Sequence, residues 1–289
     1  MNNIHYTKMH GIGNEFIIIN ETDRFTNLEL SELSKKIHNN NSDISSDGLI
    51  NIEVSKNDSI DLVMNMFNPD GSEAEMCGNG IRCVTLFAID QKMINKTQDI
   101  SIQTGAGILT TSQIAGTNNI VVNMGKPSFD LENNINIDEV GSYQKDYEIG
   151  HHIYFSVGGT RIDNASTVSM GNPHLITFID NVDDWPLETI GPLVENHSFF
   201  PNRINFEIAE IQNMNNIKLR VWERGAGITK ACGTGACATF YAALTMKETN
   251  TKDVNVHLPG GTLKLSYYDN NIYMEGPAEY LSDGDWQDI

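Results

Sequence analysis

Two cysteines recur in the same short context at widely separated points of the chain. Cys77 begins the motif Cys-Gly-Asn-Gly, and Cys232 begins Cys-Gly-Thr-Gly 155 residues further on (232 − 77 = 155). Each motif leads into an apolar stretch, residues 81–94 and residues 237–246, that predicts a buried helix. Unpaired backbone N–H groups and the positive end of the dipole stabilise an anion at a helix start. We therefore expect a thiolate to be favoured at each motif, beside N–H groups that could hold a substrate carboxylate.

Two such motifs could act together on a single carbon atom. A thiolate on one side of a bound α-carbon can remove its proton, while a thiol on the opposite side delivers another proton. This chemistry inverts the carbon and requires neither a cofactor nor a metal. The paired motifs therefore predict a cofactor-independent amino-acid epimerase, an isomerase, in which Cys77 and Cys232 form the acid/base pair.

Other interpretations of the cysteines and glycines are less favoured. A cysteine near a glycine is usually a small buried hydrophobe, and this is our interpretation of Cys83 and Cys237, which fall inside the apolar stretches. At about 100° per helical residue, these two would point away from Cys77 and Cys232, which argues against a four-cysteine zinc site. Neither motif has the Gly-Lys-Ser/Thr ending of a phosphate-binding loop or the dinucleotide-binding fingerprint. We expect no metal.

Further landmarks indicate that the chain consists of two homologous halves. Gly105 and Gly260 are also 155 residues apart (260 − 105 = 155), and the pair Gly13-Asn14 recurs as Gly171-Asn172 after 158 residues (171 − 13 = 158). A chain of 289 residues also exceeds the usual domain size of about 100 to 200 residues. We predict one domain from residues 1–122 plus 275–289, which carries the first cysteine motif, and one from residues 123–274, which carries the second.

Around the motifs, the hydrophobic pattern predicts short strands and few helices. Helical spacing is found at residues 28–38, and residues 187–196 are helical or a loop. Strand patterns occur at residues 4–20, on both sides of a glycine turn, near Val168 and Ile176, and at residues 49–54, 60–67, 204–211 and 218–223. The mixture indicates an α+β fold.

Composition limits the choice of partners. Acidic residues outnumber basic residues 38 to 19, which gives a formal charge of −19, and no Lys/Arg-rich run is present. We therefore expect a small-molecule substrate, no nucleic acid and no membrane surface.

No run approaches the roughly 18 apolar residues of a membrane helix, and residues 1–15 lack the pattern of a signal peptide. Four cysteines are too few for a disulfide scaffold, so we expect a cytoplasmic protein with reduced thiols.

In its motifs the chain resembles the diaminopimelate epimerase family over nearly its whole length. The motifs that carry the resemblance lie at residues 8–14, 67–72, 76–83, 170–174, 201–205, 222–225 and 231–238. The resemblance implies two pseudo-symmetric α+β domains, each a mixed β-sheet rolled around a central helix, with the active site in the cleft between them. It also implies interconversion of LL- and meso-2,6-diaminopimelate without pyridoxal phosphate, for lysine and peptidoglycan synthesis.

The resemblance also implies a role for each matching residue. Cys77 and Cys232 match the acid/base pair. The remaining residues match those that present N–H groups to the reacting carboxylate (Gly78, Asn79, Gly233, Thr234), grip the non-reacting end of the substrate (Asn68, Asn172, Asn205, Arg224), lie near the reacting amino group (Asn14, Glu223) or support the thiols (His174 with Glu223). The residue types suit these tasks, because a guanidinium can fork onto a carboxylate and amides both donate and accept.

Two positions depart from the family pattern, and two alternative functions stay open. Gly48 stands where some members have Gln, and Ser282 stands where members often place an aromatic residue at a dimer contact, so a homodimer is possible but not implied. The chain could instead be a related two-thiol racemase for proline, hydroxyproline or histidine, or a non-catalytic amino-acid-binding module. The four residues assigned to the non-reacting end favour a substrate with a second polar end.

Overall fold

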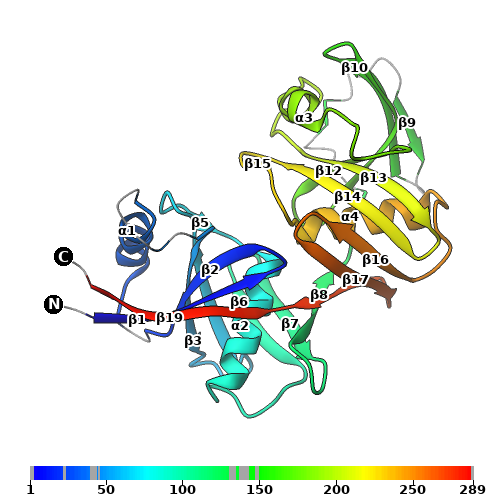
Figure 1. Ribbon diagram of the computed structural model, residues 1–289. Helices are drawn as coiled ribbons and strands as arrows, with labels where there is room; N and C mark the ends of the chain where they lie inside the picture. The colour runs from blue at the N-terminus through cyan, green and yellow to red at the C-terminus, as the bar shows by residue number, and fades with distance from the viewer. Residues whose placement is uncertain are drawn as a thin grey trace. The chain divides into compact units, whose positions relative to one another are not determined.

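The computed structural model describes residues 3–21, 24–39, 44, 46–129, 135–136, 143–146 and 150–287. The chain divides into two compact units (Figure 1), the first formed by Met1–Asn123 and Glu275–Ile289 and the second by Met124–Met274. The chain leaves the first unit within strand β8 (Asn119–Gly125) and returns within β18 (Asn271–Pro277). Strands with few helices make up both units, which confirms the predicted α+β class.

The first unit is a mixed sheet. Its strands are β1 (Asn3–Gly11), β2 (Asn14–Ile19), β3 (Leu49–Val54), β4 (Leu62–Phe67), the two-residue β5 (Glu73–Ala74), β6 (Ile100–Thr104), β7 (Gly107–Gln113), part of β8, and β19 (Glu279–Gln287). β1 pairs antiparallel with β2 and β19, and β2 runs parallel to β3. β3 pairs antiparallel with β4, β4 runs parallel to β6, and β6 pairs antiparallel with β7.

The second unit repeats the same order of pairings. Its strands are β9 (Tyr143–Asp146), β10 (Gly150–Val157), β11 (Thr160–Ser169), β12 (Pro173–Phe178), β13 (Asn205–Asn213), β14 (Asn216–Glu223), the two-residue β15 (Gly227–Ile228), β16 (Asp253–Leu258), β17 (Gly261–Tyr268) and most of β18. β11 pairs antiparallel with β12, and β12 runs parallel to β13. β13 and β14 are antiparallel, β14 and β16 are parallel, and β16 and β17 are antiparallel.

A central helix lies inside each sheet. In α2 (Gly78–Asp90) every residue from Gly78 to Ala88 is buried. α4 (Gly233–Thr245) contacts β11, β12, β13, β14, β16 and β17, so the sheet of its unit surrounds it. A helix buried in this way is apolar over most of its circumference, which explains the long apolar stretches after the cysteine motifs.

The starts of both central helices agree with the prediction, whereas the end of α2 does not. Each helix begins at the glycine that directly follows the cysteine, so each cysteine motif lies at a helix start. The predicted stretch 81–94 extends past the end of α2 at Asp90, because Lys92 adopts a left-handed backbone conformation with φ 56°.

Each unit also has an outer helix. The N-cap residue of α1 (Asn27–Ile37) is Thr26. Its hydroxyl accepts from the Glu29 N–H, and the Glu29 carboxylate accepts from the Thr26 N–H, which together form a capping box. Its buried side chains pack with Ile17, Ile19 and other residues of the sheet. α3 (Leu187–Glu195) packs in the same way against an apolar cluster that includes Phe155 and Phe206. The ambiguous stretch at 187–196 is therefore a helix.

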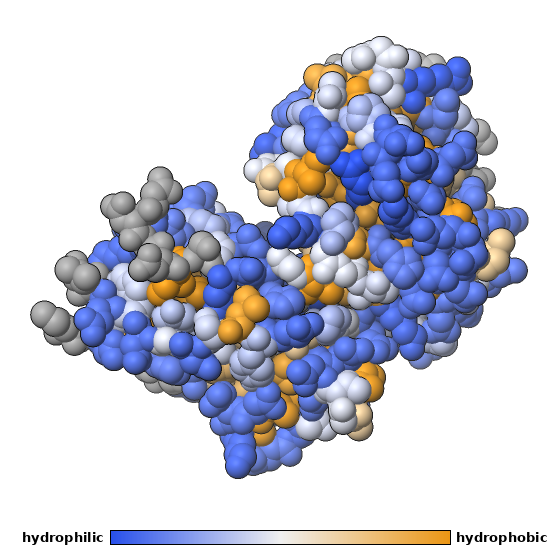
Figure 2. Space-filling view, viewed as in Figure 1, coloured by the Kyte–Doolittle hydropathy of each residue, from blue (hydrophilic) through white to orange (hydrophobic). Residues whose placement is uncertain are grey.

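Hydrophilic residues cover most of the face shown in Figure 2, in agreement with the formal charge of −19. Among the described residues, every helix is too short or too polar to cross a lipid bilayer.

One buried cation ties the central helix of the first unit to the end of β18. Arg82 on α2 is fully buried, and its guanidinium donates from Nη1 to the Gly78 carbonyl at 2.9 Å and from Nε to the Pro277 carbonyl at 3.2 Å. A Cβ on Gly11 would lie 2.9 Å from Nη2, so that glycine makes room for the guanidinium. Arg82 thus joins β1, α2 and the end of β18.

We expect Arg82→Met to lower the free energy of unfolding by about 1–3 kcal/mol, because buried carbonyl groups lose a charged donor that an apolar side chain cannot replace. Urea unfolding measures the change. Lys35→Met is the matched control, since it removes an exposed ion pair with Glu32 on α1 of the same unit and should change stability by about 0.5 kcal/mol or less. Equal losses in the two variants would show that burial of Arg82 does not matter.

Candidate active site

Cys77 lies at the start of α2, in contact with Asn14. It is the N-cap residue, with extended backbone angles (φ −135°, ψ 117°), and its side chain is half-buried. The thiol donates to Asn14 Oδ1 at 3.5 Å, and Asn79 Nδ2 donates to the same oxygen at 3.2 Å. Asn14 Nδ2 in turn donates to Asp47 Oδ2 at 2.6 Å. The structure therefore brings together three predicted site residues of the first unit, Cys77, Asn14 and Asn79.

Asp47 explains how the loop around Gly48 reaches the site. Its Oδ2 atom accepts from the Glu15 N–H at 2.8 Å as well as from Asn14. A Cβ on Gly48 would lie 3.0 Å from the Phe67 carbonyl oxygen, so a side chain at that position would require the neighbours to move. The loop therefore contacts Asn14 through the side chain of Asp47. The sequence did not point to Asp47, because a single aspartate in a polar loop carries no distinguishing pattern.

Asn68 lies apart from this group of hydrogen bonds. It follows β4, and its Nδ2 donates to Ser72 Oγ at 2.9 Å within a turn that Asp70 also stabilises. Its backbone carbonyl accepts from Ser34 Oγ of α1 at 2.8 Å. The structure therefore shows Asn68 as part of a turn, with its side chain half-buried.

Cys232 has the same backbone position on α4 but a different environment. It is the N-cap residue, with φ −125° and ψ 109°, and it is only 5% exposed. Its Sγ atom accepts from the Gly235 N–H at 3.4 Å and lies 3.6 Å from Thr234 Oγ1. Asn172 Nδ2 donates to that Thr234 hydroxyl at 3.3 Å.

The hydrogen bonds continue from Asn172 into the core of the second unit. His174 Nε2 is 3.0 Å from Asn172 Oδ1, and His174 Nδ1 is 2.7 Å from Glu207 Oε1. The side chains of His174 and Glu207 are completely buried. A continuous series of contacts, which we name the Glu207–Cys232 chain, therefore runs from Glu207 through His174, Asn172 and Thr234 to Cys232.

The surroundings of Cys232 favour its thiol over its thiolate. Burial is the largest cause and raises the pKa of Cys232 well above its ordinary value, and the nearby carboxylates of Glu223 and Glu207 raise it further. The contacts with Thr234 and the Gly235 N–H lower the pKa but do not outweigh burial. The expectation of a favoured thiolate is therefore wrong for Cys232, because a helix start offsets only part of the cost of burying a charge.

Two further predicted site residues lie where β14 ends: Glu223 is its last residue, and Arg224 begins the turn that follows. The Arg224 N–H donates to Asn205 Oδ1 at 2.9 Å, and Asn205 Nδ2 donates to the Pro173 carbonyl at 2.9 Å, so Asn205 ties the turn to β12. Glu223 accepts a hydrogen bond from Thr229 Oγ1. The Arg224 side chain is exposed, and it pairs with no carboxylate among the described residues, although Nη1 donates to the Asn202 carbonyl at 3.2 Å. Its guanidinium can therefore receive an anionic ligand.

Glu195 holds this turn from the side of α3. Its carboxylate accepts from Trp222 Nε1 at 2.7 Å, from the Gly225 N–H at 2.9 Å and from Arg203 Nη1 at 3.0 Å. Two of these donors flank Glu223 and Arg224 in the sequence. Glu195 was not predicted, because an acidic residue at the end of a helix is usually a solvated one.

The second glycine of each cysteine motif lies in close contact with its surroundings. A Cβ on Gly80 would lie 3.0 Å from Ile50 Cδ1. A Cβ on Gly235 would lie 2.7 Å from Glu207 Oε1 and 3.2 Å from Cys232 Sγ. The glycine three residues after each cysteine thus lets the first turn of the helix approach its surroundings.

The other two cysteines are core residues, as predicted. Cys83 and Cys237 are fully buried within α2 and α4, and burial raises the pKa of Cys83 to about 12. In the part of the chain that the structure describes, no three side chains of His, Cys, Asp or Glu are grouped as metal ligands.

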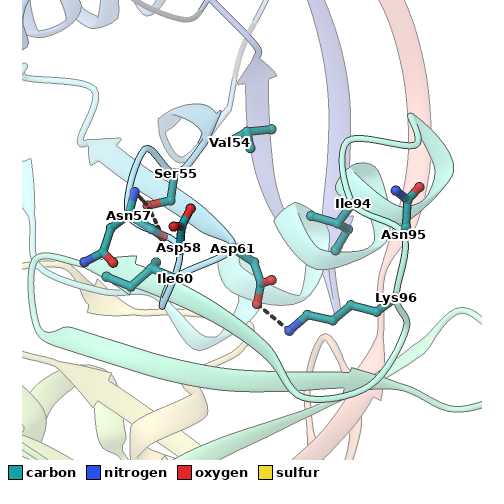
Figure 3. Close-up of a pocket in the computed structure, with 9 residues that line it drawn as sticks. All are labelled: Val54, Ser55, Asn57, Asp58, Ile60, Asp61, Ile94, Asn95 and Lys96. Atoms are coloured by element: carbon teal, nitrogen blue, oxygen red, sulfur yellow. Dashed lines mark hydrogen bonds and ion pairs between the residues drawn. The ribbon is translucent and has the colours of Figure 1, made fainter.

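A hollow of about 430 Å³ in the first unit is lined by none of the predicted site residues. Figure 3 shows its lining, which comes from the connection between β3 and β4 and from residues that follow α2. Its Asp61 is already paired, with Lys96 at 2.8 Å and with the Ser101 N–H at 2.7 Å. Because Cys77 lies at the opposite end of α2, a 13-residue helix, the hollow is roughly 20 Å away along the helix axis.

Comparisons with known proteins identify close relatives. The profile of the family described as diaminopimelate epimerase matches residues 6–130 and 166–281. The chain is 43% identical over 285 residues to a diaminopimelate epimerase of Methanococcus maripaludis, covering 97% of this chain and 98% of that protein. It is 40% identical over 285 residues to a diaminopimelate epimerase of Halothermothrix orenii, covering 96% of each.

Solved structures with much lower identity share the fold. A Bacillus anthracis phenazine biosynthesis protein of the PhzF family has a TM-score of 0.69 at 16% identity, covering 99% of this chain and 100% of that chain. A hydroxyproline epimerase from Agrobacterium vitis has a TM-score of 0.64 at 11% identity, covering 98% of this chain and 92% of that chain. These likenesses establish the two-domain α+β fold alone.

We expect Glu195→Ala to lower the free energy of unfolding by about 2–4 kcal/mol, because three donors lose their common acceptor. Thermal or urea unfolding of the purified protein measures the loss. Glu188→Ala, also on α3, removes an exposed partner of Arg220 and serves as the control, with an expected change of about 0.5 kcal/mol or less. If the two variants unfold at the same denaturant concentration, Glu195 does not organise the turn.

Proposed function

The chain belongs to the diaminopimelate epimerase family and is an isomerase, and from this premise we propose that it interconverts LL- and meso-2,6-diaminopimelate with Cys77 and Cys232 as the acid/base pair. The observation that carries the proposal is the equivalence of the two cysteines. Each is the extended N-cap residue of a central buried helix, at the same point in a repeated strand order. Equivalent positions suit two groups that must perform the same proton transfer in opposite directions.

The proposed reaction moves one proton off the α-carbon and another onto it. A thiolate removes the proton from one face, and the thiol of the other cysteine protonates the opposite face. Because its surroundings favour the thiol form of Cys232, Cys232 acts as the acid and Cys77 as the base in one direction of the reaction. After one turnover the protonation states are exchanged, and the same pair then serves the reverse reaction.

The helix starts supply the second requirement, which is stabilisation of the negative charge that develops on the substrate. The first N–H groups of an α-helix have no partner within it, and an anion near them is favoured. In the proposal, the reacting carboxylate is held by N–H groups of Gly78, Asn79, Gly233 and Thr234. Holding it there makes the α-proton easier to remove, because charge that spreads into the carboxylate meets fixed donors.

The remaining predicted residues are proposed to recognise the two amino groups and the distal carboxylate. Arg224 carries an exposed guanidinium for that carboxylate. An amide nitrogen has two N–H groups, and Asn172 and Asn205 each use one in the protein contacts described above, so a second can face the substrate. Asn68 completes the proposed distal set, and Asn14 and Glu223 are assigned to the reacting amino group.

A second candidate substrate is a cyclic amino acid such as proline or hydroxyproline, since a hydroxyproline epimerase shares the fold. The exposed Arg224 and relatives that are about 40% identical over nearly the full length favour diaminopimelate. Incubation with LL-diaminopimelate, proline and hydroxyproline in heavy water distinguishes these substrates. The homodimer, the cytoplasmic location and the absence of a nucleic-acid partner stay predictions from the sequence.

We expect wild-type protein in heavy water to convert LL-diaminopimelate into the meso isomer with deuterium at the inverted α-carbon. Cys77→Ala and Cys232→Ala should each reduce net epimerisation by at least about 10²-fold, since each variant lacks the acid or the base. Cys83→Ala is the control, because it shortens a buried helix cysteine that takes no part in the reaction. Near wild-type turnover by either Cys77→Ala or Cys232→Ala would refute the two-thiol mechanism.

We expect Arg224→Lys to lower kcat/KM more than tenfold, because an ammonium group cannot make a planar two-pronged contact with a carboxylate. Arg161→Lys, at an exposed ion pair with Asp163 in the same unit, should leave kcat/KM unchanged. The comparison uses initial rates with LL-diaminopimelate. A change at Arg224 below about threefold, roughly 0.7 kcal/mol, would place this residue outside the substrate site.

A further inference from the structure

Glu207 is a carboxylate in the apolar core of the second unit, and no sequence motif pointed to it. It lies on β13 between Phe206 and Ile208, and its side chain is completely buried. Oε1 lies 2.7 Å from His174 Nδ1, whereas Oε2 is buried without a hydrogen-bond partner among the described residues. A buried anion with an unsatisfied oxygen costs far more than a buried neutral acid. The group must therefore hold, or closely share, a proton.

The hydrogen bonds around His174 determine how many protons the pair carries. Asn172 Nδ2 donates to Thr234, so the amide oxygen of Asn172 faces His174 Nε2. A carbonyl oxygen can only accept, and His174 Nε2 must therefore carry a hydrogen. The contact between His174 Nδ1 and Glu207 Oε1 needs a second hydrogen, on one atom or the other. With either placement, the pair has two protons and no net charge.

We propose that Glu207 is a positioning residue for Cys232: it shares one proton with His174 and thereby holds the Glu207–Cys232 chain in the arrangement that orients the thiol. The proposal rests on the proposed function of Cys232 as an acid/base group. It assigns His174 the role of a link in this chain and not that of a base, since both ring nitrogens are occupied.

The elements packed around Glu207 agree with a fixed position for its side chain. His174 approaches from β12, Cys232 and Gly235 from α4, and Glu223 influences it from β14. Burial raises the pKa of Glu207, His174 lowers it, and the charge of Glu223 raises it further. Gly235 leaves the space that Oε1 occupies.

Two variants of Glu207 separate positioning from simple packing. Gln can donate an N–H to His174 Nδ1 and so preserve the hydrogen on Nε2, whereas Leu fills the space without any hydrogen bond. We expect Glu207→Gln to retain kcat within about threefold, and Glu207→Leu to lower kcat on the order of 10²-fold with KM changed less than threefold, because a thiol displaced by about 1 Å reacts poorly. Glu210→Leu on the same strand is the matched control and should retain kcat.

The nitrogen NMR signals of His174 test the proton count without any assay of activity. We expect a protonated Nε2 throughout the neutral pH range in wild-type protein and in Glu207→Gln. An unprotonated Nε2 in wild-type protein would overturn the proposal, as would full kcat in Glu207→Leu or equal losses in the Gln and Leu variants. If wild-type protein failed to epimerise diaminopimelate while Nε2 was protonated, the proposed function would fail and the shared proton would stand.

Discussion

The structure depends on the first turn of a helix that is buried on nearly all sides. Such a turn leaves backbone N–H groups without partners inside the helix, and an apolar interior offers them none. In both units a cysteine occupies the N-cap position of this turn, and a glycine three residues later lets the helix approach its neighbours. Gly80 lies against Ile50, and Gly235 lies against Glu207. The packing that buries the helix thereby limits which residue types can follow the cysteine.

The two helix starts share a backbone frame but differ in their polar surroundings. Cys77 is half-buried and contacts an amide that Asp47 holds, whereas Cys232 is buried at the end of the Glu207–Cys232 chain. Burial and nearby carboxylates favour the protonated form of Cys232. A reaction that needs one acid and one base at the same moment is served by this difference, because two identical thiols would have to compete for a single proton.

Buried glutamates organise the second unit around the residues of the proposed site. Glu195 gathers three donors at the turn that carries Arg224, and Glu207 holds His174. Burying a carboxylate is costly, and the cost is offset only where donors are available at short distance. Glu195 and Glu207 support the residues that are assigned to the substrate. The geometry of the proposed site therefore depends on groups that need not touch the substrate.

The sequence by itself determined the family, the α+β class, the repeated cysteine motifs and the core positions of Cys83 and Cys237. These are local patterns, in which residue type and spacing carry the information. The end of α2 was predicted four residues too late (94 − 90 = 4), because the apolar pattern continues past Asp90 although Lys92 adopts a left-handed backbone conformation. Only the tertiary structure revealed the contacts of Glu207, Glu195 and Asp47 and the preference of Cys232 for its thiol. The preference depends on burial and on charges from strands distant in sequence, and no spacing along the chain encodes either quantity.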